Sequence, residues 1–332
     1  MLDAMKASRI DLPLCAPIYS VSHGQGSVTS ILHDNISLRN WYLNNSMVLS
    51  VRDGNPGGLF RPNIDICQSG PEDNPYIERQ EILLTFLDGA VCRVIKNMIN
   101  KGYYVYFGAI DDYYMKGRSG YHKRHYLHDG LICGYDTVNK SYSIYAYDTD
   151  MKYRVFDMPQ SCFERARKSS ERMGFCGSLM AMKPMKMKIE LDPYLIKNRI
   201  IEYLDPPLVK NNLEENETAY GIIAHKYLIK YIDVLYNCDS DAVNLNLQAF
   251  KMIMEHKLFM LERIKKVEEY FDINDSISTA YSEASDKAIQ LWNLCLYSVI
   301  KSDKSKIPVM KSILERIDML ESNLLSRLIS LY

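Results

Sequence analysis

Several features that would mark a particular class of protein are missing from this 332-residue sequence. No apolar run approaches the roughly 20 residues that cross a bilayer. The N-terminal "MLDAMKASRIDLPL" has neither the basic start nor the long apolar stretch of a signal peptide. The formal net charge is only -1, which gives no overall attraction to nucleic acid or to an anionic membrane. We therefore expect a cytoplasmic protein that binds neither, and the sequence leaves its oligomeric state open.

Paired cysteines and a phosphate-binding loop are missing as well. The eight cysteines form no C-x-x-C, which argues against a zinc ribbon or a thioredoxin motif. The Gly/Pro-rich "RDGNPGGLFRPN" lacks the Lys-Ser/Thr pair of an ATP site, so no cofactor is expected. Hydrophobic residues nevertheless make up 47% of the chain, enough for a sizeable packed core.

The chain changes character near residue 190. Before it, the pattern predicts a helix after Ser27, a helix over residues 76–100, and strands at "YYVYFG", "LHDGLICGYD", "SYSIYAYD" and "KYRVFDM". Beyond it, apolar residues recur every three or four positions, as in the series that begin at Leu247 and Val309, which predicts four or five packed helices. We therefore expect an α+β domain over residues 1–190 and a helical bundle over residues 191–332.

Two adjacent strands carry the residues with the clearest chemical potential. His128 lies at the start of "HDGLICGYD", and Asp148 ends "SYSIYAYD". If these strands pair antiparallel, the two side chains meet at one edge of the sheet, where the aspartate would orient the imidazole and stabilise its cation. Asp150 is the alternative orienting residue. This arrangement predicts nucleophilic catalysis with His128 as the base.

The nucleophile should come from a distant segment, and "SHGQGSVTSILHD" offers Ser27. At a helix N-terminus its hydroxyl would lie near free backbone N–H groups, which stabilise a developing oxyanion, and Gln25 is a candidate oxyanion donor. The alternative is that Ser27 is only an N-cap, for which serine is preferred. Cys15 is a rival nucleophile, but the prolines beside it in "LPLCAPIYS" indicate an extended segment and a structural thiol.

The segment "DDYYMKGRSGYHKRHYLHDGLICGYD" resembles the N-terminal domains of the butirosin biosynthesis protein H family, which have an Asp-Tyr-Tyr run, spaced histidines and a Gly-Tyr-Asp strand. These domains are similar to papain-like and bacteriocin-processing cysteine peptidases. The likeness covers residues 12–160. It implies a papain-like fold with a nucleophile at residue 27, a base at His128 and an orienting carboxylate at Asp148.

The resemblance also implies a reaction. An acyl or peptidyl chain is taken from the phosphopantetheine thioester of a carrier protein, held on the enzyme, and passed to an amine to form an amide. The whole chain looks similar to members of clostridial thiotemplated pathways such as closthioamide assembly, an antibiotic biosynthesis in which the acceptor is a diamine. The implied partners are a carrier protein and a small-molecule amine.

Two positions depart from the family pattern. Ser27 stands where these enzymes have cysteine, and Gln25 lies closer to residue 27 than their oxyanion glutamine does. A serine hydroxyl is almost wholly protonated at neutral pH, whereas cysteine has a usable thiolate fraction. Our hypothesis is therefore that Ser27 replaces a cysteine.

Other interpretations of the same residues stay open. His122, His125 and His128, together with His23 and His33, could bind zinc, although no nearby Cys or Glu completes a set.

The basic residues of this segment have two interpretations. Arg118, Lys123 and Arg124 could hold a phosphopantetheine phosphate or an acidic carrier protein, or they could form a solvated loop. The alternative functions are a cysteine-type peptidase or amidase, and a non-catalytic scaffold on a decayed papain fold.

Overall fold

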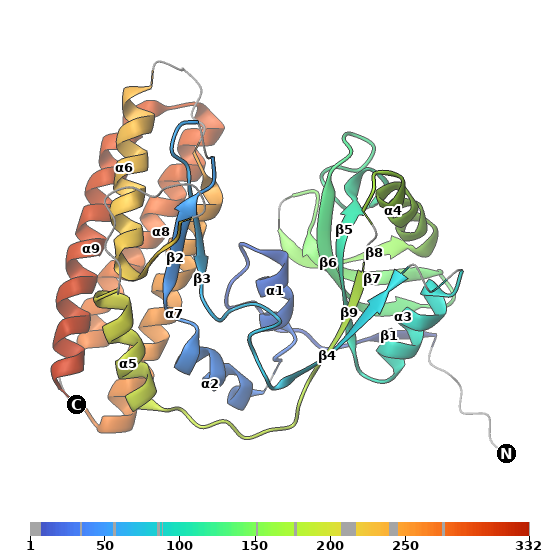
Figure 1. Cartoon of the computed structure of the whole chain (residues 1–332), viewed down its shortest axis with the longest axis horizontal. Coiled ribbons are helices and arrows are strands. Elements are labelled where there is room, and N and C mark those ends of the chain that lie inside the picture. The colour runs from blue at the N-terminus through green and yellow to red at the C-terminus, as the bar shows by residue number, and fades with distance from the viewer. Residues whose placement is uncertain are drawn as a thin grey trace. The chain divides into compact units, whose positions relative to one another are not determined.

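The protein, a computed structural model shown in Figure 1, forms two compact units. Unit 1 consists of Met1–Leu38 and Gly70–Lys188, and unit 2 of Arg39–Ser69 and Ile189–Tyr332. The predicted boundary near residue 190 agrees with this division, but the prediction did not assign residues 39–69 to the helical unit. The residues that the structure describes are 8–33, 35–55, 58–84, 87, 89–150, 152–175, 178–206, 217–238, 245–273 and 276–331.

Unit 1 is built on an antiparallel sheet with the strand order β4-β9-β5-β6-β7-β8, and β1 pairs with β6 beside this path. The strands that "YYVYFG" and the following runs predicted are confirmed, including the antiparallel pairing of β6 with β7. The strands are β1 (Arg9–Asp11), β4 (Ile77–Leu83), β5 (Tyr104–Asp111), β6 (Leu127–Asp136), β7 (Ser141–Tyr147), β8 (Tyr153–Pro159) and β9 (Ser178–Pro184).

Helices lie on both faces of this sheet (Figure 1). Because side chains alternate between the faces of a strand, Ile132 and Ile144 enter the core that α3 (Val91–Asn100) and α4 (Gln160–Arg172) cover. Leu131 and Tyr145 point to the opposite face, where α1 (His23–Ser30) packs against β6. One turn of 3-10 helix, η2 (Asp112–Tyr114), follows β5 directly and contacts α4.

The helix expected over residues 76–100 is wrong in its first half. Residues 77–83 form β4, which pairs with β9 along its whole length, and the α-helix among the described residues of this range is Val91–Asn100. Pairing with a strand about a hundred residues away supplies backbone hydrogen bonds that a local four-residue spacing cannot reveal. The end of the helix was predicted correctly, because Gly102 has φ +81°, a conformation that glycine adopts freely.

Unit 2 confirms the prediction of a helical region after residue 190. Its long helices α7, α8 and α9 pack in sequence, and α6 and α5 pack against α9 (Figure 1). A small sheet of order β10-β2-β3 packs on α6 and α7. The elements are α2 (Ile36–Asn45), β2 (Leu49–Asp53), β3 (Pro62–Ile66), α5 (Pro193–Leu204), β10 (Ala219–Tyr220), η3 (Gly221–Ile223), α6 (Ala224–Asn237), α7 (Leu247–Phe271), α8 (Ile277–Lys301), η4 (Lys304–Lys306) and α9 (Ile307–Ser330).

The interior of unit 2 contains charged side chains that the apolar stripes did not predict. On α7, Leu258 is 41% exposed, whereas Lys257 and Arg263 are fully buried. Arg263 donates to the carbonyls of Leu43 and Ser46 at the end of α2, and Lys257 binds Glu321 of α9 at 2.5 Å. Each buried charge is thus hydrogen-bonded, as a low-dielectric interior requires. Within the described ranges, every helix is too short or too polar to cross a membrane.

Candidate functional site

The strongest candidate for a functional site is the side chain of His128 at the start of β6. Its Nδ1 lies 2.5 Å from Oδ2 of Asp112, which belongs to η2. The carboxylate is buried, and the imidazole is 31% exposed. A buried carboxylate on Nδ1 fixes the tautomer and ring orientation and leaves Nε2 directed to a substrate, so the pair has the geometry of a base and its orienting residue.

A buried arginine fixes the other oxygen of the Asp112 carboxylate. Arg118 donates from Nε to Oδ1 at 3.0 Å, and its side chain is 1% exposed. The remaining guanidinium nitrogens donate to the carbonyls of Tyr147 at the end of β7 and of Asp129 in β6. Arg118 therefore joins three elements around Asp112 and is buried, so neither interpretation of it from the sequence, a phosphate-binding residue or part of a solvated loop, is correct.

A β-bulge lies beside His128. The β5–β6 register shifts between Phe107 and Ile110, and Ala109 in the bulge has φ +53°. Asp129 accepts from the backbone N–H of Ala109 and from the hydroxyl of Tyr106. Bulges are frequent beside active sites because they re-aim side chains, and this one accompanies the end of β6 that carries His128.

Ser27 does not begin a helix. The helix α1 starts at His23 with Ser22 as its N-cap, so Ser27 is the fifth helical residue. The prediction that its hydroxyl lies among free N–H groups at a helix N-terminus is wrong, because the polar turn "HGQG" is itself the first turn. Gln25 lies in that turn, where it is buried and its backbone N–H binds the cap.

The Ser27 side chain is fully buried beside a tyrosine of β8. Burial raises the pKa of Tyr153. Among the described residues, neither its hydroxyl nor that of Ser27 has a hydrogen-bond partner. The close packing of Tyr153 against α1 depends on Gly26, since a Cβ at that position would lie 2.7 Å from the Tyr153 hydroxyl oxygen. A substrate can reach residue 27 only if the side chains that bury it move.

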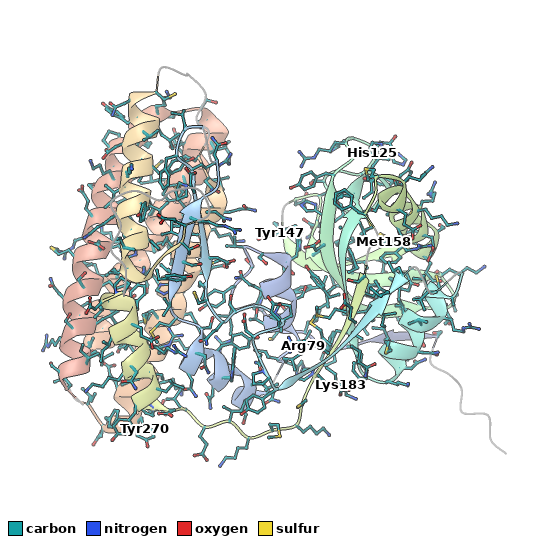
Figure 2. All side chains as sticks on the ribbon, viewed as in Figure 1. Arg79, His125, Tyr147, Met158, Lys183 and Tyr270 are labelled. Carbon is teal, nitrogen blue, oxygen red and sulfur yellow. The ribbon has the colours of Figure 1, made fainter. Side chains whose placement is uncertain are left out.

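His23 links α1 to the His128 site. It precedes Ser27 by four residues, so the two side chains share a face of α1. Its ring centroid lies 5.5 Å from that of His128 and 5.5 Å from that of Tyr147, which Figure 2 labels. In the part of the chain that the structure describes, no hydrogen bond joins Ser27 to His128. The structure thus places both predicted residues near His23, without a hydrogen bond between them.

Asp148 does not orient His128, contrary to the prediction. Although β6 and β7 pair as expected, Asp148 lies beyond the end of β7, and its Oδ1 accepts from the backbone N–H groups of Asp150 and Lys152. Its Oδ2 forms an ion pair with Arg154 of β8. Burial would raise the pKa of Asp148, but these bonds lower it below its usual value. Asp148 thus stabilises the β7–β8 hairpin.

Asp150 is not the orienting residue either. This exposed carboxylate forms an ion pair at 3.0 Å with Arg154, four residues further along the chain.

Cys15, the rival nucleophile, also has a structural environment. Its backbone N–H donates to the carbonyl of Ser30, and its thiol lies 3.3 Å from that carbonyl oxygen and 3.5 Å from that of Thr29. These carbonyls end α1, where a helix has acceptors without intrahelical donors. Cys15 therefore caps the helix that carries Ser27.

The spaced histidines have separate partners. His125 binds Asp111 at 2.7 Å and stacks on Tyr113, and Ser169 of α4 donates to the same Asp111 oxygen. Burial raises the pKa of Asp111, but these hydrogen bonds lower it below its usual value overall. His122 is exposed. Over the described ranges, no three His, Cys, Asp or Glu side chains are grouped as a metal site would require.

Comparison with known proteins adds nothing to this geometry. No protein-family model matches the chain, and a search of curated proteins finds no match.

The residues that sequence reasoning missed are those that act through other side chains. Asp112 stands in the "DDYY" run, shortly after the predicted strand "YYVYFG" and before the histidines, and this position was the available signal. Arg118, His23 and Tyr153 had no such signal, because their roles depend on contacts between segments far apart in the sequence.

Proposed function

We propose that unit 1 is an acyltransferase that forms amides through a covalent intermediate on residue 27. The observation that carries the proposal is the series His128, Asp112 and Arg118, in which an accessible imidazole is oriented by a buried and anchored carboxylate. His128 is the general base, and Asp112 takes the orienting role that the resemblance gave to Asp148. Residue 27 is the nucleophile on the adjoining helix.

The reaction has two halves, and each transfers one proton through His128. In the first, residue 27 attacks the thioester carbonyl, His128 takes its proton, the carbon–sulfur bond breaks, and the released thiolate receives the proton. In the second, an amine attacks the acyl-enzyme, His128 takes the amine proton, and it returns the proton to residue 27 as the bond to the enzyme breaks. The products are an amide and a free carrier thiol.

The buried position of residue 27 sets a condition for this chemistry. Ser27 is fully buried and Tyr153 packs against the neighbouring Gly26, so the side chains that cover residue 27 have to move before an acyl group can enter. A serine hydroxyl needs the base more than a thiol does, because it is protonated at neutral pH. The proposal therefore includes cysteine as the competent nucleophile at position 27.

A second candidate function is a non-catalytic scaffold. The burial of Ser27 and its lack of a hydrogen bond to His128 favour it. The two candidates differ in whether a thiol at position 27 can be acylated.

The test uses the Ser27→Cys variant, an acyl thioester of a carrier protein and intact-mass spectrometry followed by peptide mapping. We expect one acyl adduct on residue 27, its loss when His128→Ala is added, and amide formation when an amine follows. The parent chain controls for the native cysteines, and Ser30→Cys controls for a buried thiol elsewhere on α1. No adduct on residue 27 in a folded variant would favour the scaffold.

A further inference from the structure

Helix α4 carries two parallel stripes of charged residues, and among the residues that the structure describes only the first forms internal ion pairs. Glu164, Arg167 and Glu171 form one stripe, and Arg167 makes ion pairs with both glutamates. Arg165, Lys168 and Arg172 are spaced by three and four residues, so they form a second stripe on a neighbouring face. All three are exposed, and within the described ranges none of them pairs with a carboxylate. The positive charge of this second stripe is therefore not neutralised by the protein.

The second stripe lines a pocket of about 560 Å³ together with Tyr114 and Glu171. The guanidinium carbon of Arg165 lies 5.9 Å from the centroid of the Tyr114 ring. Glu171 is the one acidic group in the lining, and Arg167 neutralises it. Two guanidinium groups and an ammonium group around one pocket are suited to a phosphate, whose oxygens accept several charge-assisted hydrogen bonds.

Short connections join this pocket to the His128 site within unit 1. Tyr114 and Asp112 belong to the same turn, η2, so the residue that lines the pocket lies two positions from the one that orients His128. On the pocket side, Ser169 of α4 donates to Asp111 at 2.7 Å, which fastens the helix to this turn. The pocket is therefore held in a constant relation to the catalytic base.

The exposed segment before His128 extends the positive surface. His125 binds the same Asp111 oxygen as Ser169, which places this segment beside α4 (Figure 2). Lys123 and Arg124 precede it, and Arg124 lies over the ring of Tyr126, which contacts His128 edge to face. Positive charge thus continues from the pocket toward the base, in a chain whose net charge is -1.

We propose that the pocket formed by Tyr114, Arg165, Lys168 and Arg172 binds the phosphate of a phosphopantetheine arm. The identity of the arm rests on the proposed function. The binding of a phosphate rests on the second stripe, whose positive charges have no carboxylate partner among the described residues. Coenzyme A and a carrier protein bear the same arm, so either is a source of this chemistry. The phosphate would anchor the arm at α4, beside the turn that orients His128.

Calorimetry with small probes tests the site without any turnover. We expect 4′-phosphopantetheine and coenzyme A to bind at least roughly tenfold more tightly than pantetheine, which lacks phosphate, with a difference that shrinks at high salt. The Arg165→Gln/Lys168→Gln/Arg172→Gln variant should lose this difference. The matched control Arg93→Gln/Lys140→Gln/Lys186→Gln removes three exposed positive charges elsewhere in unit 1 and should retain it. Glu171→Gln should tighten binding.

Carrier proteins distinguish the two sources. Tighter binding of a holo carrier than of its apo form, lost in the α4 triple variant, identifies the carrier-bound arm, whereas equal binding of the two forms identifies coenzyme A as the source. Equal affinity for pantetheine and 4′-phosphopantetheine, or unchanged binding in the triple variant, overturns the proposal. These readouts are independent of acylation at residue 27, so the phosphate site and the proposed function can fail separately.

Discussion

The rings of His23 and His128 lie edge to face, with their centroids 5.5 Å apart. This contact joins the first residue of α1 to the start of β6, two elements that the sequence separates widely. Because His23 shares a helix face with Ser27, the position of α1 against β6 sets where residue 27 lies relative to His128. The site therefore depends on packing between elements as much as on the residues themselves.

Replacing each aspartate by asparagine should distinguish the roles of Asp112 and Asp148. Asp112→Asn keeps the shape but removes the charge that stabilises the imidazolium, so we expect kcat in the Ser27→Cys background to fall by roughly 10²–10⁴-fold. Asp148→Asn alters only the β7–β8 hairpin and should leave kcat within about threefold. Steady-state aminolysis rates of the two variants measure the difference. Equal losses would argue against Asp112 as the orienting residue.

Removal of the buried cation should destabilise unit 1. Arg118→Met leaves the Asp112 carboxylate buried beside an apolar side chain, which should lower the free energy of unfolding by about 3–5 kcal/mol. Arg154→Met removes a half-exposed arginine from the buried Asp148 carboxylate, which keeps hydrogen bonds from two backbone N–H groups, so its cost should be smaller. Urea denaturation gives both values. If Arg118→Met unfolds no more easily than Arg154→Met, Arg118 does not stabilise the buried carboxylate.

A methyl group at Gly26 should disturb the contact with Tyr153. Its carbon would lie 2.7 Å from the hydroxyl oxygen, so Gly26→Ala should cost about 1–3 kcal/mol of stability. Gly24→Ala is the matched control in the same helix, because its nearest neighbour would lie at 3.6 Å, an ordinary contact. Thermal unfolding compares the two variants. Tyr153→Ala should relieve the Gly26→Ala penalty, and the absence of such relief would exclude a direct clash.

Unit 2 should lose stability in mild acid because two of its histidines are fully buried. Burial, aided by the charge of Lys257, lowers the pKa of His256 far below its usual value and also lowers that of His225. A folded pKa below the unfolded one means that the unfolded chain binds the proton first. The stabilisation is therefore complete above pH ~6.5 and declines below it by about 1.4 kcal/mol per pH unit for each histidine.

The carboxylate of Glu321, which pairs with Lys257, does not titrate between pH 7.5 and 5.5. Although burial opposes it, Lys257 lowers the pKa of Glu321 to about 2. Urea denaturation at pH 7.5, 6.5 and 5.5, followed through the helical signal, measures the slope. His256→Gln should reduce the slope, and the exposed His122→Gln should leave it unchanged. A free energy of unfolding that stays constant from pH 7.5 to 5.5 would contradict the burial of both histidines as neutral groups.

Much of the fold could be predicted because its signals are local. Alternation in "SYSIYAY" places Ile144 in the core and Tyr145 on the other face, and steps of three and four residues mark the helices beyond residue 190. The segment over residues 76–100 could not be predicted this way, since β4 exists through its pairing with β9. Periodicity reports which face is apolar, not which distant strand supplies hydrogen bonds.

For the site, the sequence by itself determined the chemical groups, and the tertiary structure decided their partners. A histidine at the start of one strand, with aspartates near, was enough to predict a base with an orienting carboxylate. Whether that carboxylate is Asp112 or Asp148 depended on how η2 and the β7–β8 hairpin turn at the ends of their strands. Hydrogen bonds act over about 3 Å, so they are set by the folded backbone and not by spacing along the chain.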